Sequence, residues 1–439
     1  MFQIYLFLTI AKFVIGFDST INPVLFSLCG AVSTTSATIS IEVSQPSKIN
    51  LALIDQATGK LVSEEAININ NSVKYEWTRL IPGREYRYYL KSEDTKQIYW
   101  DGIFTTFSNN PFSYKIAFGS CSETGSESKI FQTIADQDPL FFMVTGDLHY
   151  EDIGENCTER FEEAYQKTFM SKSQQGLYKK SAFVYIWDDH DFGPNNADSS
   201  NPCKKAAYNQ YKRNIPHYPL SMPDSTGALS QKFDAGRVTF ILSDLRSQKT
   251  RPVYQECERI KKGEVFGSER HLNWFKESMI EAKMKGNIVV WVSSYPYINA
   301  SGGPNFKCNE RDNWGGFPEE RAEIADFIKT NEIPVLILSG DAHMVAIDDG
   351  TNSDYAIGGG APVKVFHAAP LDRPGSYKGG PYSHGYSREN GQFGIMEVKD
   401  DGGKEICILW YAKNKDGNPV LNTEGKEIKL DFCVPLPNK

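Results

Sequence analysis

Two strings of the type Gly-Asp-x-His stand about two hundred residues apart in the chain. Asp147 and His149 follow the apolar run 140–145, and Asp341 and His343 follow the run 335–338. A single Gly-Asp pair after a strand is usually only a turn, because glycine accepts positive φ and aspartate bonds its own backbone. A repeated pair that also carries histidine instead suggests a ligand-bearing turn.

A third string lies between these two and is more acidic. Residues 188–191 read Asp-Asp-His-Asp and directly follow the apolar run 184–187. A charged run is normally a solvated loop, but this one begins at the end of a predicted buried strand. Burial of so much negative charge without cations would be prohibitive. The three strings together therefore predict a metal site.

Three further apolar runs end in residues that could join such a site. The run 115–118 leads to Cys121, the run 238–242 leads to Asp244 and Arg246, and the run 288–292 leads to Ser293. In layered α/β folds the carboxyl ends of the strands converge on one edge, where sites are built. Six strand ends could therefore meet in one place.

The elements that would position these residues fall into two regions. Residues 17–108 contain short runs rich in Val, Ile, Thr and Tyr that alternate apolar with polar positions, as in 37–43 and 85–91. This pattern predicts an immunoglobulin-like β-sandwich, and residues 80–88 resemble the turn and strand of fibronectin type III domains.

After the linker 108–111, apolar strands alternate with amphipathic helices. Helical spacing is present in 128–135, 268–285 and 318–330, the last of which begins with proline. We therefore expect an α/β layered domain over 112–398, with the strands of 399–439 completing one sheet edge.

Composition limits the class of function. The 439 residues are enough for two domains, and 40% hydrophobic with 23% charged residues is typical of a globular protein. A net charge of −8 and a pI near 5.6 argue against nucleic-acid binding, which needs a basic face. The composition is still compatible with a small anionic substrate, because the positive charge of local metal cations can outweigh the negative charge of a mildly acidic surface. The sequence leaves the oligomeric state open.

The first sixteen residues are predicted to be a signal peptide. Residues 1–16 are mostly apolar and end in glycine, and they are too few to span a membrane. The alternative is a buried N-terminal strand. No apolar segment near the C-terminus predicts a stable membrane anchor. Eight cysteines and sequons at Asn70, Asn156 and Asn299 fit a secreted or extracytoplasmic protein, including one of the endomembrane lumen.

Four motifs together resemble the PhoD-like alkaline phosphatases (alkaline phosphatase D) of the calcineurin-like metallophosphoesterase superfamily. They are Phe-Gly-Ser-Cys-Ser at 118–122, Gly-Asp-Leu-His-Tyr-Glu-Asp at 146–152, Ile-Trp-Asp-Asp-His-Asp-Phe at 186–192 and Ser-Gly-Asp-Ala-His at 339–343. The resemblance covers nearly the whole chain. It implies a four-layer α/β/β/α domain after the fibronectin-like leader, with Fe³⁺ and Ca²⁺ as its metal ions.

The resemblance also implies which residues bind the two kinds of ion. The ferric site would use Cys121, Asp147, Tyr150 and His343, and the second site would share Asp147 and add Asp189 and Asp341. Thiolate and imidazole suit iron more than calcium, while carboxylates suit hard cations. Many superfamily members have a histidine where Ser293-Ser294 stands. The second site is therefore richer in oxygen, which favours Ca²⁺, or Mg²⁺ or Mn²⁺, over zinc.

The implied reaction is hydrolysis of a small phosphate mono- or diester by a hydroxide that bridges the two ions. His190 matches the superfamily histidine that contacts the phosphate or the leaving group. Arg246 would clamp phosphate oxygens, although its motif departs from the Leu-Asp-Thr-Arg of the family. The segment 366–386, with its Gly, Pro, Tyr and two histidines, is either a loop that covers the site or a surface loop.

Other hypotheses remain open at this stage. Cys121 could be a structural or disulfide-bonded cysteine, or a nucleophile oriented by His343 in a Cys/His hydrolase. If Cys121 binds metal, seven cysteines remain and at least one more is unpaired, for which we expect Cys29. The whole chain could instead be a secreted fibronectin-like binding protein whose metal site is structural or inactive.

Overall fold

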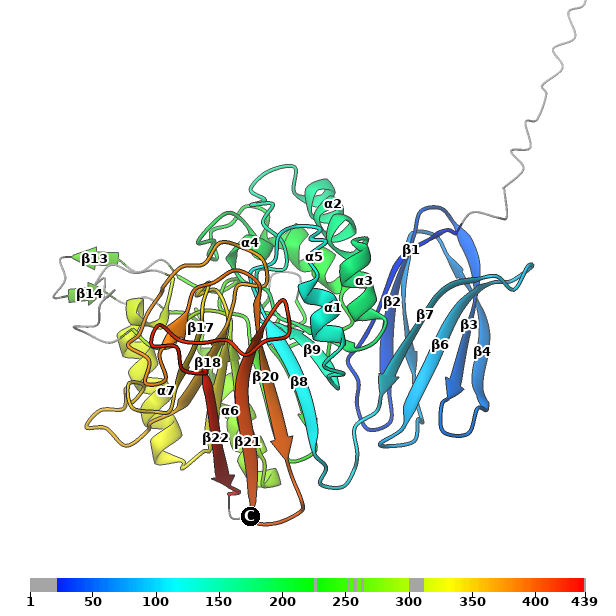
Figure 1. Cartoon of the computed structure of the whole chain (residues 1–439). Helices are drawn as coiled ribbons and strands as arrows, with labels where there is room; N and C mark the ends of the chain where they lie inside the picture. The colour runs from blue at the N-terminus through cyan, green and yellow to red at the C-terminus, as the bar shows by residue number, and fades with distance from the viewer. Residues whose placement is uncertain are drawn as a thin grey trace, which may run out of the picture.

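The computed structural model describes residues 22–224, 227–250, 253–255, 259–261, 264–299 and 312–437. The predicted signal peptide, residues 1–16, lies outside these ranges, as do Cys257 and Cys308. A small unit of strands lies beside a larger α/β unit (Figure 1).

The small unit is made of seven strands in two sheets. They are β1 (Val24–Gly30), β2 (Ala37–Val43), β3 (Ser47–Asp55), β4 (Leu61–Ile69), β5 (Ser72–Trp77), β6 (Glu85–Ser92) and β7 (Ile98–Thr105). The strand orders are β1-β2-β5 and β4-β3-β6-β7. Trp77 of β5 stacks on Phe104 of β7 with ring centroids 5.7 Å apart, so the two sheets pack on each other. The fibronectin assignment and the boundary at residue 108 remain predictions.

Two mixed sheets form the centre of the larger unit. The first has the order β22-β21-β20-β8-β9-β10 and continues into β1 of the small unit, because Gly30 pairs with Phe183. Its strands are β8 (Tyr114–Gly119), β9 (Phe141–Val144), β10 (Ala182–Tyr185), β20 (Gln392–Lys399), β21 (Glu405–Asn414) and β22 (Lys429–Pro435).

The second sheet has the order β11-β12-β15-β16-β18-β17-β19. Its strands are β11 (Gln231–Ala235), β12 (Val238–Ser243), β15 (Ile288–Ser293), β16 (Val335–Ser339), β17 (Val345–Asp348), β18 (Lys364–Ala368) and β19 (Tyr386–Ser387). A separate hairpin, β13 (Val253–Gln255) and β14 (Arg259–Lys261), projects from this side of the molecule (Figure 1).

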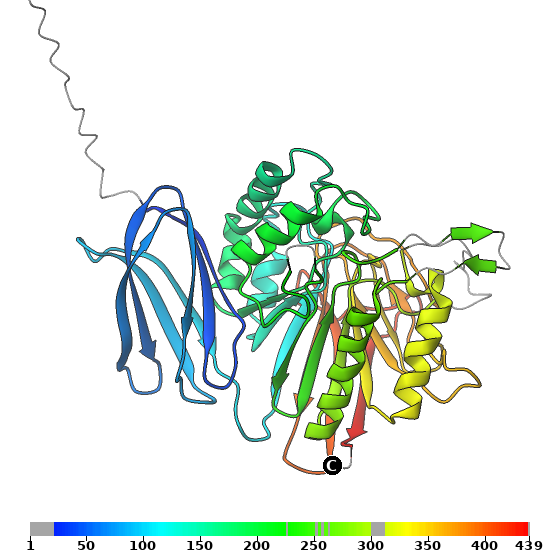
Figure 2. The same cartoon turned by 180° about the vertical axis from the view of Figure 1, so that it is seen from behind.

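Helices pack against both sheets. Those against the first sheet are α1 (Ile130–Ala135), α2 (Cys157–Phe169), α3 (Lys172–Tyr178) and α5 (Lys204–Asn214) (Figure 1). The long helices α6 (Glu269–Lys285) and α7 (Pro318–Thr330) lie against the second sheet (Figure 2). Two short elements, α4 (Asp189–Phe192) and the 3₁₀ turn η1 (Trp314–Gly316), lie in loops after strands.

Strand β15 shows why the layers stack in the order helix, sheet, sheet, helix. All six of its residues are buried, as expected for a parallel strand that is covered on both faces. Val290 packs in the core shared with the first sheet, whereas Trp291 packs in the core shared with α6 and α7. Across the seam between the sheets, the rings of Phe118 and Phe366 meet edge to face, with their centroids 5.0 Å apart.

Two disulfides are present in the described part of the chain. Cys157 at the start of α2 bonds Cys203 before α5, and Cys407 of β21 bonds Cys433 of β22. Cys29 is a free buried thiol, which confirms the expectation for this residue. Among the described helices, none is long and apolar enough to cross a membrane.

Substitutions on the two faces of β16 test the layered arrangement. Leu338 packs in the core between the sheets and Ile337 packs in the core under the helices. We expect Leu338→Ala and Ile337→Ala each to lower the free energy of unfolding in urea by about 2–5 kcal/mol. The control Ile357→Ala, at a position 75% exposed, should change it by less than about 0.5 kcal/mol. If only one of the two substitutions lowered the free energy of unfolding by this amount, the four-layer arrangement would be contradicted.

Candidate metal centre

Carboxyl ends of strands from both sheets converge on one acidic cluster. Strands β8, β9 and β10 of the first sheet lead into the loops that carry Cys121, Asp147, Tyr150, Asp189 and His190, and β16 of the second sheet leads into Asp341 and His343. Each of these residues follows its strand within a few positions. The convergence expected from the sequence is therefore present.

Several of these residues have an unusual backbone conformation. The φ angles of Cys121, Asp147, Asp341 and His343 are 61°, 54°, 56° and 50°. Non-glycine residues rarely adopt this left-handed region, and each instance costs on the order of 1–3 kcal/mol. The conformation turns the chain sharply after the strand and directs consecutive side chains to different sides.

The glycines of the two Gly-Asp strings permit close contact between strand ends. A Cβ atom on Gly146 would lie 2.5 Å from Cβ of Asp188, and one on Gly340 would lie 2.5 Å from the carbonyl oxygen of Thr145. Any side chain at either position would push the strand ends apart. These glycines therefore determine how closely the acidic residues approach one another.

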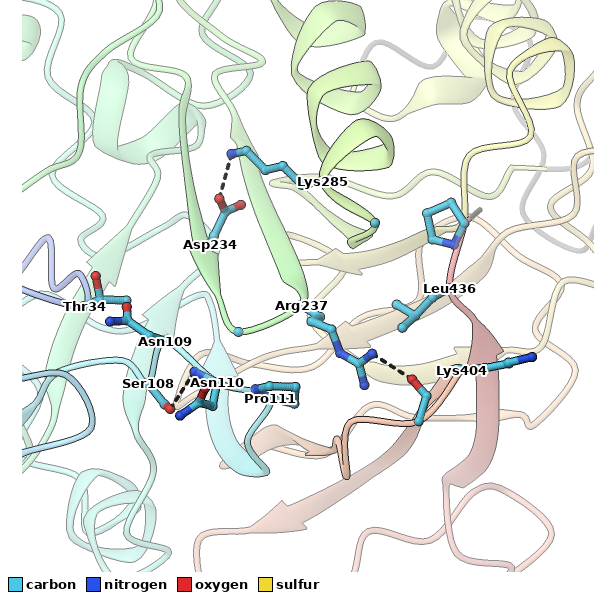
Figure 3. A pocket seen from close by; sticks show the side chains of 14 residues that line it. Thr34, Ser108, Asn109, Asn110, Pro111, Asp234, Arg237, Lys285, Lys404 and Leu436 are labelled. Atoms are coloured by element: carbon cyan, nitrogen blue, oxygen red, sulfur yellow. Dashed lines mark hydrogen bonds and ion pairs between the residues drawn. The ribbon is translucent and has the colours of Figure 1, made fainter. Parts of the chain in front are cut away.

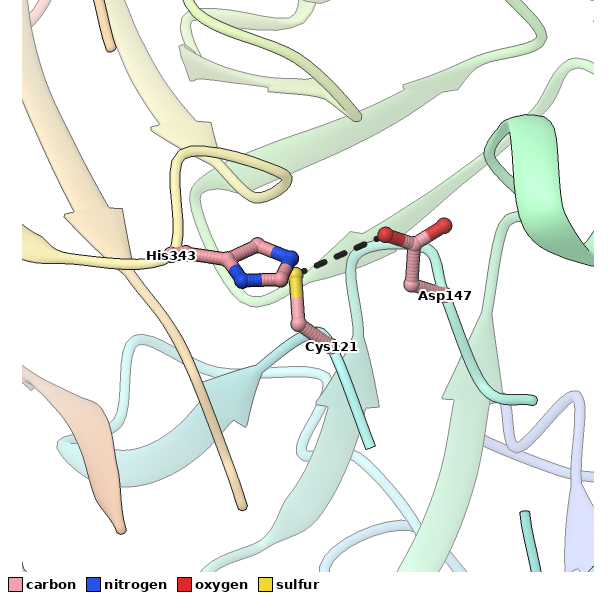
Figure 4. Close-up of side chains that lie close together, drawn as sticks. All are labelled: Cys121, Asp147 and His343. Atoms are coloured by element: carbon pink, nitrogen blue, oxygen red, sulfur yellow. Dashed lines mark hydrogen bonds between the residues drawn. The ribbon is translucent and has the colours of Figure 1, made fainter. Parts of the chain in front are cut away.

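One group of possible ligands combines sulfur, nitrogen and oxygen. The Sγ atom of Cys121 lies 3.5 Å from Oδ2 of Asp147 (Figure 4). The hydroxyl of Tyr150 donates to the same oxygen (2.7 Å) and lies 2.9 Å from Nε2 of His343. Ligand atoms of Cys121, Asp147 and His343 all lie within 4.8 Å of one another. The four residues that the resemblance assigns to one ion are thus in contact.

A second group consists of carboxylates only. Oxygens of Asp147, Asp188, Asp189 and Asp341 lie within 4.8 Å of one another, and all four residues are buried. Within the described residues, Oδ1 of Asp147 and Oδ2 of Asp341 have no hydrogen-bond partner. Asp147 belongs to both groups, as a bridging ligand would.

The electrostatics of this second group call for a cation. Burial and the neighbouring carboxylates raise the pKa of Asp147 and of Asp341 well above the usual range. Such groups stay ionised only beside compensating positive charge. Because the unpartnered oxygens and the donor set also match a hard cation, the residues fit a bound metal ion.

Arg246 provides part of the positive charge from behind the cluster. Its guanidinium is fully buried and bonds both oxygens of Asp188, one of them through Nη2 at 2.8 Å. Nη1 donates to Asp312 (2.7 Å). Ser294 also donates to Asp188 (2.7 Å). Since its oxygens are already occupied, Asp188 is an anchor, and Asp147, Asp189 and Asp341 remain available to a cation.

This position differs from the one predicted for Arg246. A phosphate that arrives from solvent would need an accessible guanidinium, whereas Arg246 has no exposed surface and contacts carboxylates. The residue therefore positions Asp188 and Asp312 instead of clamping phosphate oxygens. Burial of this kind depends on the packing of β12 in the second sheet, which its local motif does not reveal.

His190 lies at the edge of the cluster. Its Nδ1 is 2.6 Å from Oδ1 of Asp152, and its Nε2 is 4.0 Å from Oδ2 of Asp189. The ring packs on Tyr150 with centroids 4.1 Å apart, and 13% of the side chain is exposed. The contact with Asp152 fixes the ring so that Nε2 faces the acidic residues.

Comparison with known proteins supports the motifs. A sequence model described as PhoD-like phosphatase matches residues 116–402. The chain belongs to the PhoD-like phosphatase family. The resemblance drawn from the four motifs is thus confirmed, and with it the general reaction of a phosphatase.

A solved structure has the same fold. The structure described as PhoD superposes with a TM-score of 0.70 at 15% identity, over 92% of this chain and 93% of that one. The sensor domain of the anti-sigma factor RsgI4 of Pseudobacteroides cellulosolvens matches 20% of this chain and 76% of its own at 15% identity, with a TM-score of 0.17. Among curated proteins no match was found.

Only one of the two Gly-Asp-x-His strings of this PhoD-like phosphatase brings its histidine to the cluster. His149 is buried with its ring 5.7 Å from that of Tyr165, and burial lowers its pKa to about 4. The backbone N–H groups of Leu148 and His149 both donate to Asp191, and the His149 ring packs against Tyr165 instead of reaching the cluster. The expectation that both strings form equivalent ligand turns was wrong for His149.

Two charged residues of the site were missed in the sequence. Lys378 ion-pairs with Asp341 and lies 3.4 Å from Oδ2 of Asp312. The composition of the segment 366–386 did suggest a loop over the site, but nothing about a single lysine in it indicates this contact. In the sequence, no apolar run directly precedes Asp312, so the strand-end pattern could not identify it.

A separate cavity of about 630 Å³ lies at the opposite end of the sheets (Figure 3). It is lined by the linker residues 108–111, by the turn before β12 and by the end of the chain. Arg237 at this cavity is bound to Asp400 and to the carbonyl oxygen of Gly403, and Lys285 is bound to Asp234. This cavity is therefore distinct from the acidic cluster.

Replacement of Arg246 tests its positioning role. Arg246→Met would leave Asp188 and Asp312 buried without their partner, so we expect a loss of about 3–5 kcal/mol in the free energy of unfolding. Arg246→Lys should recover only part of it, because an ammonium cannot reproduce the bidentate contact. The matched control Arg270→Met removes an exposed ion pair and should cost less than about 1 kcal/mol. The free energy of unfolding of all three variants is measured by urea denaturation. Equal stability of Arg246→Met and the control would refute the role.

Proposed function

We propose that this chain hydrolyses small phosphate mono- or diesters at a centre that holds two cations. The single observation that carries the proposal is the position of Asp147, which belongs both to the group with Cys121 and His343 and to the buried carboxylate group. One carboxylate shared by two adjacent ligand groups suits a pair of ions. The family supplies the type of reaction.

The donor sets suggest which ion each group holds. Cys121, Tyr150 and His343 offer thiolate, phenolate and imidazole, which suit Fe³⁺, and the carboxylates Asp147, Asp189 and Asp341 suit Ca²⁺, Mg²⁺ or Mn²⁺. When bound, such cations activate water and neutralise charge on the phosphoryl oxygens. We propose Fe³⁺ for the first group and Ca²⁺ for the second.

His190 would act on the leaving group. Its Nδ1 is held by Asp152, so a proton on Nε2 is directed toward the acidic residues where the ester would lie. Donation of that proton to the departing oxygen would stabilise the leaving group. Tyr150, packed on the His190 ring, limits the freedom of the ring to turn away.

The remaining parts of the chain fit a secreted phosphoesterase. We propose that residues 1–16 are a signal peptide and that strands β1–β7 form a fibronectin-like module. Of the three sequons, Asn70 and Asn156 are exposed and Asn299 is buried, so the first two are the acceptors we expect in a secreted glycoprotein. The alternative, a binding protein with an inactive site, is disfavoured by the complete ligand set.

Loss of the shared carboxylate tests the proposal. We expect Asp147→Asn to lower kcat/KM for p-nitrophenyl phosphate and bis-p-nitrophenyl phosphate by on the order of 100- to 1,000-fold, as for other losses of transition-state charge stabilisation. Metal content and the visible absorption of the purified protein should fall in parallel, because thiolate and tyrosinate bound to Fe³⁺ absorb visible light. The matched control Asp234→Asn lies at the far end of β11. Undiminished hydrolysis by Asp147→Asn would exclude the proposed function.

Replacement of His190 tests its role as a proton donor. We expect His190→Gln to lower kcat by roughly 100- to 10,000-fold. The loss should be greater for phenyl phosphate than for p-nitrophenyl phosphate, because the poorer leaving group depends more on protonation. Asp152→Asn should show the same trend more weakly. A loss of equal size for both leaving groups would contradict general-acid catalysis by His190.

A further inference from the structure

We infer that Lys378 binds the phosphate oxygens of the substrate and favours monoesters, a role that rests on the proposed function of the same site. The juxtaposition behind it is a lysine whose side chain is partly exposed and whose ammonium contacts Asp341, at the border of the buried carboxylate group. Arg246 cannot take this role, because it is enclosed by Asp188, Asp189 and Asp312.

Lys378 differs from Arg246 in its access to solvent. Its side chain is 33% exposed, against 0% for Arg246, while its Nζ still reaches the oxygens of Asp341 and Asp312. The same side chain therefore reaches the acidic group with its ammonium, while part of the side chain remains open to solvent. An anion that binds beside Asp341 would lie near this charge.

The backbone around Lys378 is fixed to the turn that carries Asp341 and His343. Ser376 N–H donates to the carbonyl oxygen of His343 (2.9 Å), and Nδ1 of His343 bonds the carbonyl oxygen of Pro374 (2.7 Å). On the other side, the hydroxyl of Tyr382 donates to the carbonyl oxygen of Lys378 (2.9 Å). The lysine is thus held at the site from both sides, and only its side chain is free to turn.

The ion pair with Asp341 is the contact that a cation would replace. Asp341 lies in the group of four carboxylates, and one of its oxygens is already without a hydrogen-bond partner among the described residues. Once a cation shares this carboxylate, the attraction between Asp341 and Lys378 falls, because the negative charge is divided. The flexible lysine stem then allows the ammonium to turn to another anion at the same site.

The nearby arginine of the same segment is less suited to this role. Arg373 lies over the ring of Tyr150, with its Cζ 4.1 Å from the ring centroid, and it is ion-paired with the exposed Glu123. Its charge is therefore already balanced by a residue that no proposed metal site contains. Among the described residues, Lys378 in contrast forms its ion pairs with Asp341 of the carboxylate group and with Asp312, which Arg246 also contacts.

The extra positive charge has a consequence for the class of substrate. A phosphate monoester carries up to two negative charges and three terminal oxygens, whereas a diester carries one charge and two terminal oxygens. A cation that contacts terminal oxygens therefore stabilises the monoester more strongly. We assign phosphate monoesters as the preferred substrates of this site.

Binding of inorganic phosphate by the metal-loaded protein tests this inference without turnover. We expect Lys378→Met to weaken phosphate binding, measured by calorimetry, by roughly 10- to 100-fold, as for loss of a charged hydrogen bond. Lys378→Arg should stay within a few-fold of the wild type. The control Lys285→Met removes a lysine that pairs with Asp234 at the far end of the sheets. It should leave the affinity for inorganic phosphate unchanged. Metal content and thermal unfolding are measured on every variant.

Kinetics give a second readout. Lys378→Met should lower kcat/KM for p-nitrophenyl phosphate more than for bis-p-nitrophenyl phosphate. The ratio of the monoester kcat/KM to the diester kcat/KM should therefore fall. Unchanged phosphate affinity or an unchanged ratio in a variant with full metal content would overturn the inference. Loss of metal from Lys378→Met would overturn it too, because the lysine would then act only through the carboxylates.

The two proposals can fail separately. A wild-type protein that hydrolyses both esters, together with an unaffected Lys378→Met variant, defeats the role of Lys378 alone. A wild-type protein that hydrolyses neither ester but binds phosphate in a manner dependent on Lys378 defeats the proposed function and leaves the anion site in place.

Discussion

The burial of several carboxylates in one small volume is the constraint on which the rest of this structure depends. Asp147, Asp188, Asp189 and Asp341 lie within 4.8 Å of one another and are almost inaccessible to solvent. Like charges at such distances repel strongly where the surroundings are apolar. Arg246 balances part of this charge from inside the protein, and the remaining charge is what suits the centre to a cation.

The centre lies at the seam between the two sheets, so its geometry is a product of their packing. The first sheet contributes Cys121, Asp147 and Asp189, and the second contributes Arg246 and Asp341. Contacts such as Phe118 against Phe366 hold the sheets together a short distance below. A small shift of one sheet over the other would separate residues of the same proposed ligand group, so the packing of the core controls the geometry of the centre.

Features carried by short local motifs could be predicted from the sequence. The mixed α/β fold and the family followed from apolar strands that end in Gly-Asp or Asp-Asp-His. Features that depend on distant contacts could not. His149 and His343 have the same local sequence context, but the His149 ring packs against Tyr165 and its backbone N–H donates to Asp191. The burial of Arg246 and the contact between Lys378 and Asp341 likewise depend on packing between segments far apart in the chain.

The left-handed backbone at Cys121, Asp147, Asp341 and His343 bears on how such a site persists over evolutionary time. Glycine would relieve the backbone strain at each of these positions. A lineage that no longer needed the ions would therefore be expected to drift toward glycine or asparagine at the four positions. The four positions instead hold cysteine, aspartate and histidine, which are the side chains of the proposed ligand groups, and these four backbone angles offer a simple criterion for recognising decayed members among distant relatives.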